Sequence, residues 1–205
     1  MSRKTRREKE KLRRKNQILI AAGNVFSRKG YHNATLEDIA RKAELGKGTI
    51  YWYFTSKAEL FMAVLQAGAD ERFLRVKRAA EKAHDCRSRV EAIAREQLRY
   101  FAEKRYLMRI LSSEAVFATQ EMKREMNRFM SGRYKVYSGL IESVLKHGVA
   151  DGEIRRVDVR KMSHMLLTIF HSSVYYWQFE GVKPRPDADA RVMCRVIFEG
   201  LEKKI

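Results

Sequence analysis

Apolar residues recur at every third or fourth position in the segment that follows Thr35. The set with this spacing is Leu36, Ile39, Ala40 and Ala43. Such spacing places side chains on one face of a helix, which then packs against the rest of the protein. Thr35 lies three residues before Asp38, a pattern typical of a helix N-cap, although Glu or Gln is the more usual partner. The pattern therefore predicts a helix that begins at about Thr35.

A second short helix is expected immediately downstream, after a turn. Leu45 is the apolar residue of this turn, and Ile50 and Phe54 continue the buried stripe. The residues left for the other faces are polar, small or aromatic, namely Lys47, Gly48, Thr49, Tyr51, Trp52 and Tyr53. A supporting helix upstream, ended by Gly30, is predicted from the spacing of Ile18, Ala21, Ala22, Val25 and Phe26. Two short helices joined by a tight turn form a helix-turn-helix.

The outer face of the second helix suits the major groove of DNA. Gly48 permits close approach to the duplex, while Thr49 and the tyrosine hydroxyls can hydrogen-bond phosphates or base edges. Lys47 can neutralise a phosphate. In the alternative interpretation, this is a small helical subdomain in which Trp52 and Tyr53 only pack at the junction with the next helix. The number of coinciding features favours DNA binding.

From about Gln17 to Leu65 the sequence resembles the tetracycline-repressor (TetR) family of bacterial transcriptional regulators. The matching residues include Ala21-Ala22, Phe26, Gly30-Tyr31, Thr35, Ile39-Ala40, Lys47-Gly48-Thr49-Ile50-Tyr51, Tyr53-Phe54, Ser56-Lys57 and Glu59-Leu60. The resemblance covers about a quarter of the chain. Together with the chemistry of the second helix, it predicts DNA contacts from Thr35, Lys47, Gly48, Thr49, Tyr51, Trp52, Tyr53 and Lys57.

Two turn residues depart from the family pattern. Glu44 stands where the turn commonly has glycine, and Gly46 stands where serine usually caps the second helix. A residue other than glycine with a positive φ costs about 1 kcal/mol. A glycine cap costs only about a few tenths of a kcal/mol relative to serine. Neither departure should abolish the motif.

Charge supports a polyanionic partner independently. The formal net charge is +18, and residues 1–15 hold nine Lys or Arg against Glu8 and Glu10. A charge run by itself is usually a solvated tail, but this one precedes a DNA-binding helix and lacks the apolar core of a signal peptide. We therefore expect a basic arm that contacts phosphates or the minor groove, with strongly salt-dependent binding.

The remainder of the chain is predicted to be helical. Its only prolines are Pro184 and Pro186, and no β-branched alternation occurs. Helices are expected over about residues 57–83, 88–104, 106–117, 119–148, 158–181 and from Asp187 or Asp189 to 203, with Ser88 and Glu91 as a capping box. We predict an all-α fold of about nine helices, the number that the resemblance also implies. The expected parts are a basic N-terminal arm (1–15), a DNA-binding domain (16–56) and a helical ligand-binding and dimerisation domain (57–205).

The last two helices are predicted to form a dimer interface. In the resembling family the corresponding helices pair with those of a second subunit as a four-helix bundle. The residues assigned to this surface are Leu166, Leu167, Phe170, Val174, Trp177, Val192, Met193, Val196, Ile197 and Leu201. A two-fold homodimer would also present two recognition helices to the half-sites of a palindromic operator in double-stranded DNA. The alternative is that these residues form the core of one protomer.

The middle helices hold the candidate site for a small-molecule effector. Methionine and aromatic side chains can line an adaptable apolar cavity, while hydroxyls or imidazole orient the ligand. The candidates are Tyr100, Phe101, Met108, Phe117, Met122, Met126, Phe129, Tyr134, Tyr137, Thr168, His171 and Tyr175. A stripe of this kind is also typical of plain core.

Other functional classes find little support in the sequence. There is no phosphate-binding glycine loop, nucleophile elbow or His-Glu-x-x-His pair, so we expect neither an enzyme nor a cofactor. His164 and His171 are seven residues apart and are interpreted as structural rather than as metal ligands. Cys86 and Cys194 are expected to be reduced in the cytoplasm. Residues 165–177 are too short and polar to span a membrane.

These observations favour a ligand-responsive transcriptional regulator. We expect a repressor that binds its operator as a homodimer and is released by an effector. The resemblance implies that the ligand moves the fourth helix and changes the spacing of the two recognition helices. The alternatives are a constitutive or architectural DNA-binding protein without effector, and a helical-bundle enzyme.

Overall fold

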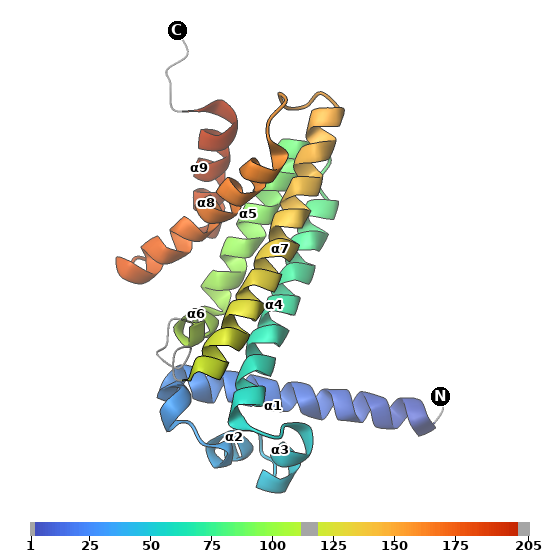
Figure 1. The fold of residues 1–205 in the computed structure, drawn as a ribbon, viewed down its shortest axis with the longest axis vertical. Coiled ribbons are helices and arrows are strands. Elements are labelled where there is room, and N and C mark those ends of the chain that lie inside the picture. Colours follow the sequence, from blue (N-terminus) through green and yellow to red (C-terminus); the bar gives the residue numbers. More distant parts are fainter. Residues whose placement is uncertain (1–2, 112–118, 201–205) are drawn as a thin grey trace. The chain divides into compact units, whose positions relative to one another are not determined.

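The computed structural model describes residues 3–111 and 119–200, nearly all of which are helical. Nine helices and no strand occur in these residues. The predicted all-α class is confirmed, and Figure 1 shows the order of the helices along the chain. Among the helices described, none is both long and apolar enough to cross a membrane.

The chain divides into two compact units. The first contains residues 1–69 and 105–129, and the second contains residues 70–104 and 130–205. The first unit includes α1 (Arg3–Asn33), α2 (Leu36–Lys42), α3 (Lys47–Tyr53) and α6 (Arg105–Leu111). Helices α4 (Lys57–Glu81) and α7 (Gln120–Ala150) are each divided between the units. The sequence suggested a domain boundary at residue 56. This division instead groups the helix-turn-helix with α6 and with the first turns of α4.

The predicted apolar stripe of the first unit is buried. Ile18, Ile39 and Ile50 are inaccessible to solvent. The rings of Phe26 and Phe61 meet edge to face, with centroids 5.3 Å apart. Helices α1 and α6 also pack closely, because a Cβ added at Gly23 would lie 2.9 Å from Cε2 of Tyr106. The helix-turn-helix is thus held on a core to which α1 and α4 both contribute.

Helix α1 is longer than the sequence indicated. It begins at Arg3, so residues 3–15 of the expected basic arm form a helical extension of the supporting helix. The left-handed backbone of Gly30, with a φ of 72°, interrupts the helix near its end. Glycine adopts this conformation without a Cβ clash. The break therefore lies where the sequence predicted the end of the supporting helix.

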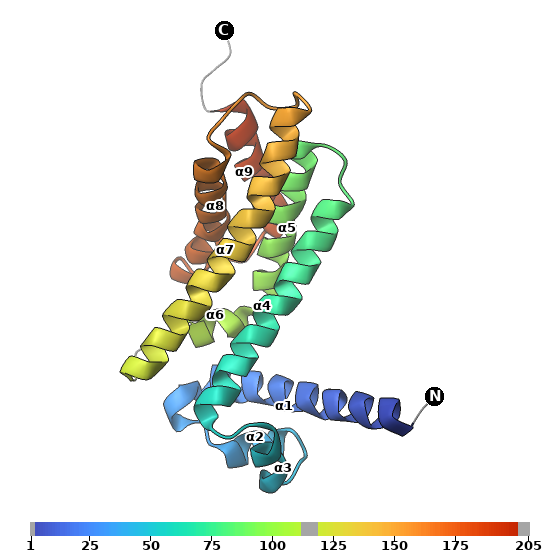
Figure 2. The ribbon, with the colours of Figure 1, turned by 45° about the vertical axis from the view of Figure 1, so that its right-hand side comes forward.

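The second unit contains α5 (Cys86–Glu103), α8 (Val159–Phe179) and α9 (Pro186–Glu199), together with the later parts of α4 and α7. Helix α5 packs against both α8 and α9 (Figure 2). The core of this unit includes Val90, Ile93 and Phe170, which are fully buried. The indole Nε1 of Trp177 donates a hydrogen bond of 2.8 Å to Asp189, which joins α8 to α9.

Two helix starts in the second unit differ from the prediction. Helix α5 begins at Cys86, because Asp85 is the N-cap and exchanges hydrogen bonds with Ser88. The prediction that Ser88 is the cap is wrong, since an Asp three residues earlier supplies the same kind of oxygen acceptor. Helix α9 begins at Pro186, whose fixed φ favours the first helical position.

The predicted start of α4 is correct, but one of the two hydrogen bonds of its cap has a different donor from that of a capping box. The Ser56 hydroxyl accepts the backbone N–H of Glu59 at 3.1 Å, as expected for an N-cap. The Glu59 carboxylate accepts from the backbone N–H of Thr55 at 2.7 Å rather than from that of Ser56. The reciprocal hydrogen bond of a capping box is therefore shifted by one residue.

Candidate nucleic-acid interface

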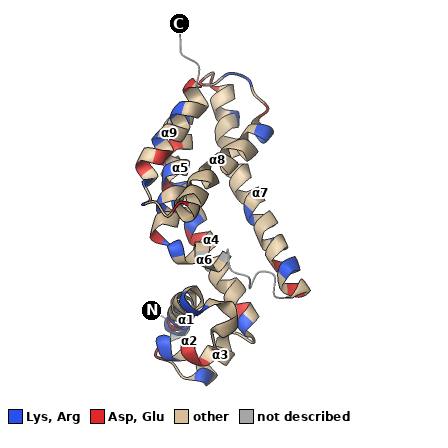
Figure 3. Cartoon of the chain, turned by 90° about the vertical axis from the view of Figure 1, so that its left-hand side faces the viewer, with Lys and Arg blue, Asp and Glu red and all other residues tan. Residues whose placement is uncertain are grey.

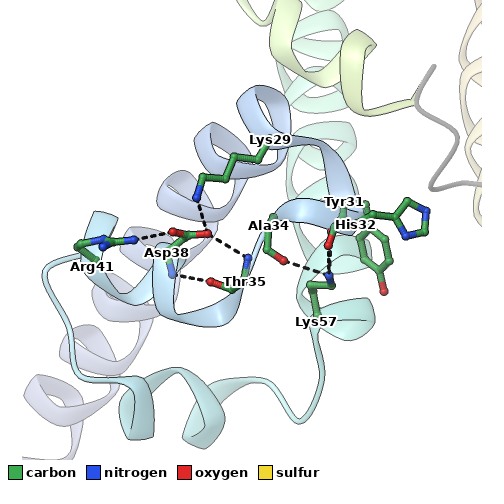
Figure 4. A network of polar contacts seen from close by, with 8 residues as sticks. All are labelled: Lys29, Tyr31, His32, Ala34, Thr35, Asp38, Arg41 and Lys57. Atoms are coloured by element: carbon green, nitrogen blue, oxygen red, sulfur yellow. Dashed lines mark hydrogen bonds and ion pairs between the residues drawn. The ribbon is translucent and has the colours of Figure 1, made fainter.

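The start of α2 is fixed by a capping box. The hydroxyl of Thr35 accepts the backbone N–H of Asp38 at 3.1 Å, and the Asp38 carboxylate accepts the N–H of Thr35 at 3.3 Å (Figure 4). The same carboxylate binds Lys29 at 2.7 Å and Arg41 at 2.6 Å. The hydrogen bond from Lys29, above all, holds the pKa of Asp38 far below its usual range. Asp38 is therefore ionised at neutral pH and joins α2 to α1.

The turn between α2 and α3 has the conformation that the family pattern implies. Glu44 has a φ of 54°, which is the left-handed region that a side chain disfavours. The backbone N–H of Leu45 donates to the carbonyl of Ala40 at 2.9 Å and closes the turn. The amide of Gln17 on α1 donates to the carbonyl of Ala43 at 2.7 Å. These hydrogen bonds hold the turn in place against the strain at Glu44.

Helix α3 directs most of its side chains away from the core. Ile50 is its one buried residue. Trp52 is 66% exposed and Tyr51 is 48% exposed, which is unusual for aromatic side chains of this size. A Cβ added at Gly48 would meet nothing within 4 Å. The half-buried ring of Tyr53 meets that of Trp52 edge to face, with centroids 4.7 Å apart.

Lys47 and Thr49 complete the outer side of α3. Lys47 forms an ion pair with Glu37 of α2, and its side chain is 51% exposed. This hydrogen bond lowers the pKa of Glu37 and raises the pKa of Lys47. Thr49 is half-buried. An exposed ion pair contributes little to stability, so Lys47 can exchange Glu37 for a phosphate at low cost.

Lys57 is engaged differently. Its ammonium donates to the backbone carbonyls of Tyr31 at 2.8 Å, His32 at 3.1 Å and Ala34 at 3.0 Å (Figure 4). An ammonium has three N–H donors, so all are used. Lys57 thus satisfies carbonyls at the end of α1, where a helix lacks partners for them. The sequence suggested a DNA contact for Lys57, and from these hydrogen bonds we propose a structural cap instead.

This difference between two lysines can be measured. Lys47→Met should lower the slope of log K against log salt concentration by about 1, because one phosphate contact is lost. Lys57→Met should leave that slope unchanged but lower the free energy of unfolding by about 1 kcal/mol, because carbonyls lose their donors. DNA titrations at several salt concentrations and thermal melts give both values. A lower slope for Lys57→Met, without lower stability, would restore it as a phosphate contact.

The basic extension of α1 belongs to the same unit as α3. The ammonium of Lys11 lies 5.0 Å from the ring centroid of Trp52, and that of Lys15 lies 5.8 Å from the ring of Phe54. Glu10 pairs with Arg13 and Arg14, which reduces the charge of that turn. Nearer the N-terminus, exposed cations remain at Arg6, Arg7 and Lys9. Figure 3 shows Lys and Arg of the chain in blue, including those of this helix.

The residues assigned to a dimer interface separate into two groups. Six are buried in the protomer itself: Leu166, Leu167, Phe170, Val174, Trp177 and Met193. Val192 and Val196 are exposed, and Ile197 is half-buried, whereas Leu201 lies outside the described residues. Other large apolar side chains of α8 are exposed instead, namely Met165, Tyr175, Tyr176 and Phe179. The outer face of these helices therefore consists largely of residues that the sequence did not assign to the interface.

The candidate effector residues also separate. Tyr100, Phe101, Tyr137 and His171 belong to the second unit, where Phe101 contacts His171 with ring centroids 6.0 Å apart. Met108, Met122, Met126 and Phe129 belong to the first unit. Tyr134 is exposed and stacks on His164, while Thr168 and Tyr175 are exposed on α8. Phe117 lies outside the described residues.

Two polar residues near the second-unit group were missed. Arg72 contacts the rings of Phe101 and Tyr137, and its Nε donates to the Tyr137 hydroxyl at 2.8 Å. Gln97 is fully buried and lies 3.5 Å from His171, measured between their Nε2 atoms. The signal for Gln97 was present, because a polar residue interrupts the apolar stripe of α5. Nothing in the sequence distinguishes Arg72 from the many exposed cations.

Comparisons with known proteins agree with this arrangement. The model of a family described as bacterial regulatory proteins, tetR family, matches residues 18–64. The fatty acid metabolism regulator protein of Bacillus subtilis is 22% identical over 197 residues, which are 96% of this chain and 100% of that protein. The transcriptional activator FasR of Mycolicibacterium smegmatis is 42% identical over 79 residues, 38% of this chain and 36% of that protein.

Among solved structures, the fold resembles that of the transcriptional regulator FadR from Bacillus subtilis, determined in complex with stearoyl-CoA. The TM-score is 0.77 at 21% identity, and the match covers 91% of this chain and 98% of that one. At this identity the likeness shows a common fold. By name, FasR is a transcriptional activator, FadR is a transcriptional regulator and the first relative is a regulator of fatty acid metabolism.

Proposed function

Because the chain belongs to the TetR family of bacterial transcriptional regulators, we propose that it binds a palindromic operator as a homodimer and represses transcription until an effector releases it. DNA binding and transcriptional regulation are properties of the family. The operator symmetry, the repression and the effector are the parts proposed. The observation that carries the proposal is the exposed outer side of α3, where Tyr51 and Trp52 have no packing role in the core.

The DNA contacts proposed come from α3 and the start of α2. Gly48 leaves room for the duplex, and Tyr51 and Trp52 offer polar and planar groups to base edges or phosphates. Thr35 and Thr49 add hydroxyls. Lys47 adds a positive charge that can bind a phosphate, because its exposed ion pair with Glu37 is weak. Because the side chain of Tyr53 is half-buried, we propose that its hydroxyl, and not its ring, contacts a phosphate.

A homodimer is supported by the exposed apolar side chains of α8 and α9. Phe179 is 78% exposed, Val192 is 60% exposed and Tyr176 is 59% exposed. Large apolar groups that are exposed together often mark an interface between proteins. We therefore propose this face, with Met165 and Val196, as the contact with a second copy. Its two-fold symmetry would match two operator half-sites.

A fatty acyl-CoA is the effector class that the relatives favour. One relative along nearly the whole chain is a fatty acid metabolism regulator, and a protein with this fold was solved with stearoyl-CoA. We propose that an acyl-CoA binds the second unit and lowers the affinity for the operator. A tenfold release requires about 1.4 kcal/mol of differential affinity between the two conformations. A relative that matches 38% of this chain is named as an activator, so transcription itself must be measured.

The test begins with genomic fragments retained by the full-length protein. Footprinting of the retained DNA should give two half-sites related by a two-fold axis, and sedimentation of the free protein should give the mass of a dimer. Stearoyl-CoA at saturating concentration should raise the Kd for this DNA at least about tenfold, the factor set by that coupling, and transcripts next to the site should increase. If stearoyl-CoA binds without changing operator affinity, or if deletion of the gene lowers these transcripts, the corresponding part of the proposal is wrong.

A further inference from the structure

A buried amide in the second unit has an unused hydrogen-bond acceptor. Gln97 of α5 is inaccessible to solvent. Within residues 3–111 and 119–200, its Oε1 is the only buried side-chain nitrogen or oxygen without a hydrogen-bond partner. Buried polar groups are almost always paired, so each exception requires an explanation.

A neutral imidazole lies beside this amide. Burial, and to a lesser degree the charge of Arg72, lower the pKa of His171 to about 4, so the ring is neutral at neutral pH. A neutral imidazole has one ring nitrogen that donates and one that accepts, so the nitrogen that faces Gln97 can accept a hydrogen bond. The amide nitrogen Nε2 of Gln97 lies 3.5 Å from this ring nitrogen, where it can donate, and Oε1 lacks a donor.

A cation without a counter-ion lies beside the same rings. The Arg72 guanidinium carbon is 4.6 Å from the ring centroid of Phe101 and 4.5 Å from that of Tyr137. Its Nε donates to the Tyr137 hydroxyl at 2.8 Å. No Asp or Glu of the described residues forms an ion pair with Arg72, although other arginines of this unit have such partners. The remaining N–H groups of Arg72 are suited to a carbonyl or carboxylate.

We propose that Arg72 and Gln97 bind the polar group of the effector, with an acceptor of the ligand on Arg72 and a donor of the ligand on Gln97 Oε1. The ligand class is an acyl compound whose carbonyl or carboxylate lies near a hydroxyl or a secondary amide. A 3-hydroxy fatty acid has this chemistry, and so does an acyl-CoA, whose thioester carbonyl is followed by amides. His171 is a positioning residue, because it holds the amide of Gln97. The inference rests on the proposed function, since it places the effector in this unit.

Three ligands with the same acyl chain separate the two contacts. Laurate offers an acceptor only, 3-hydroxylaurate adds a hydroxyl donor, and lauroyl-CoA adds amide donors. Their Kd values are measured by calorimetry on the full-length protein. Gln97→Met, which keeps the size of the side chain, should weaken only the ligands with donors, by about tenfold. Arg72→Met should weaken all three by a similar or larger factor.

The melting temperature of the ligand-free protein provides a second readout. Gln97→Met should leave it unchanged or raise it, because an unsatisfied acceptor is removed. A marked decrease would mean that an internal water already satisfies Oε1, and the assignment would then be wrong. The exposed Gln120, changed to Met, is the matched control and should alter neither the melting temperature nor any Kd.

The outcomes separate this inference from the proposed function. Equal effects of Gln97→Met on laurate and on both ligands with donors would overturn the role of Gln97. The effector proposal would still stand if lauroyl-CoA released the operator. If none of the three ligands binds, both the site and the acyl effector are wrong. The ligand that loses more affinity in Gln97→Met identifies whether the donor is a hydroxyl or an amide.

Discussion

Replacing Arg6, Arg7 and Lys9 together by glutamine should weaken binding to every DNA sequence by a similar factor. Each phosphate that a cation neutralises contributes about 0.9 to the salt slope. Loss of three such contacts should lower the slope by up to about 3 and the affinity by about a hundredfold at low salt. Glutamine forms helices nearly as well as arginine and lysine, so the extension of α1 should remain helical. Fluorescence titrations against operator and random DNA, over a range of salt concentrations, provide the slopes.

The control is a variant with the same change in charge at another place. Arg155, Arg156 and Lys183 are exposed residues of the second unit, and their replacement by glutamine should change the slope much less. Equal losses in the two variants would mean that only net charge matters. A loss confined to the operator would mean that the extension reads bases rather than phosphates.

Replacing Gly148 by alanine should destabilise the protein by about 1–3 kcal/mol, the usual cost of an overpacked core. A Cβ at this position would lie 2.6 Å from both Cβ and Sγ of Cys86, and 3.4 Å from Cγ1 of Ile154. Carbon atoms in contact are normally separated by about 3.5–4.0 Å. The first turn of α5 would have to move away from the end of α7. The free energy of unfolding, from denaturant titration, measures the effect.

Gly139 on the same helix is the matched control. A Cβ added there would meet nothing within 4 Å. Gly139→Ala should therefore stabilise the protein by about 0.5–1 kcal/mol, since alanine favours the helix. Cys86→Gly combined with Gly148→Ala should recover part of the loss. Equal stabilisation by alanine at both glycines would contradict the close contact between α5 and α7.

Local patterns were sufficient to predict the helix-turn-helix. The stripe of Leu36, Ile39 and Ile50 and the capping pair of Thr35 and Asp38 all act within a few residues. Glu44 was recognised as a strained turn residue for the same reason, because the φ of a tight turn depends on its immediate neighbours. The contacts that the sequence did not indicate join distant segments. Lys57 is an example, since its three acceptors lie more than twenty residues upstream.

The dimer surface and the effector site show the same limit. Helix α8 has apolar residues on two faces, and periodicity groups residues of one face without indicating which face the protomer itself covers. The structure buries Leu166 and Phe170 and leaves Tyr176 and Phe179 exposed. Similarly, the role proposed for Gln97 depends on its contact with His171, which lies far along the chain. The charge of Arg72 also lowers the pKa of His171. Sequence spacing within one helix carries no information about such partners.

The continuous helix of α1 makes the basic extension a rod of fixed length and phase. Residues 3–15 belong to that helix, and at about 1.5 Å per residue they span about 20 Å, the length of about six base pairs. A flexible tether would tolerate small insertions, whereas a rod does not. One residue added after Lys15 would turn every cation of the extension by about 100° around the axis, and four would nearly restore their direction. If the extension binds along DNA, as we propose, its reach is therefore set by helical geometry as much as by charge.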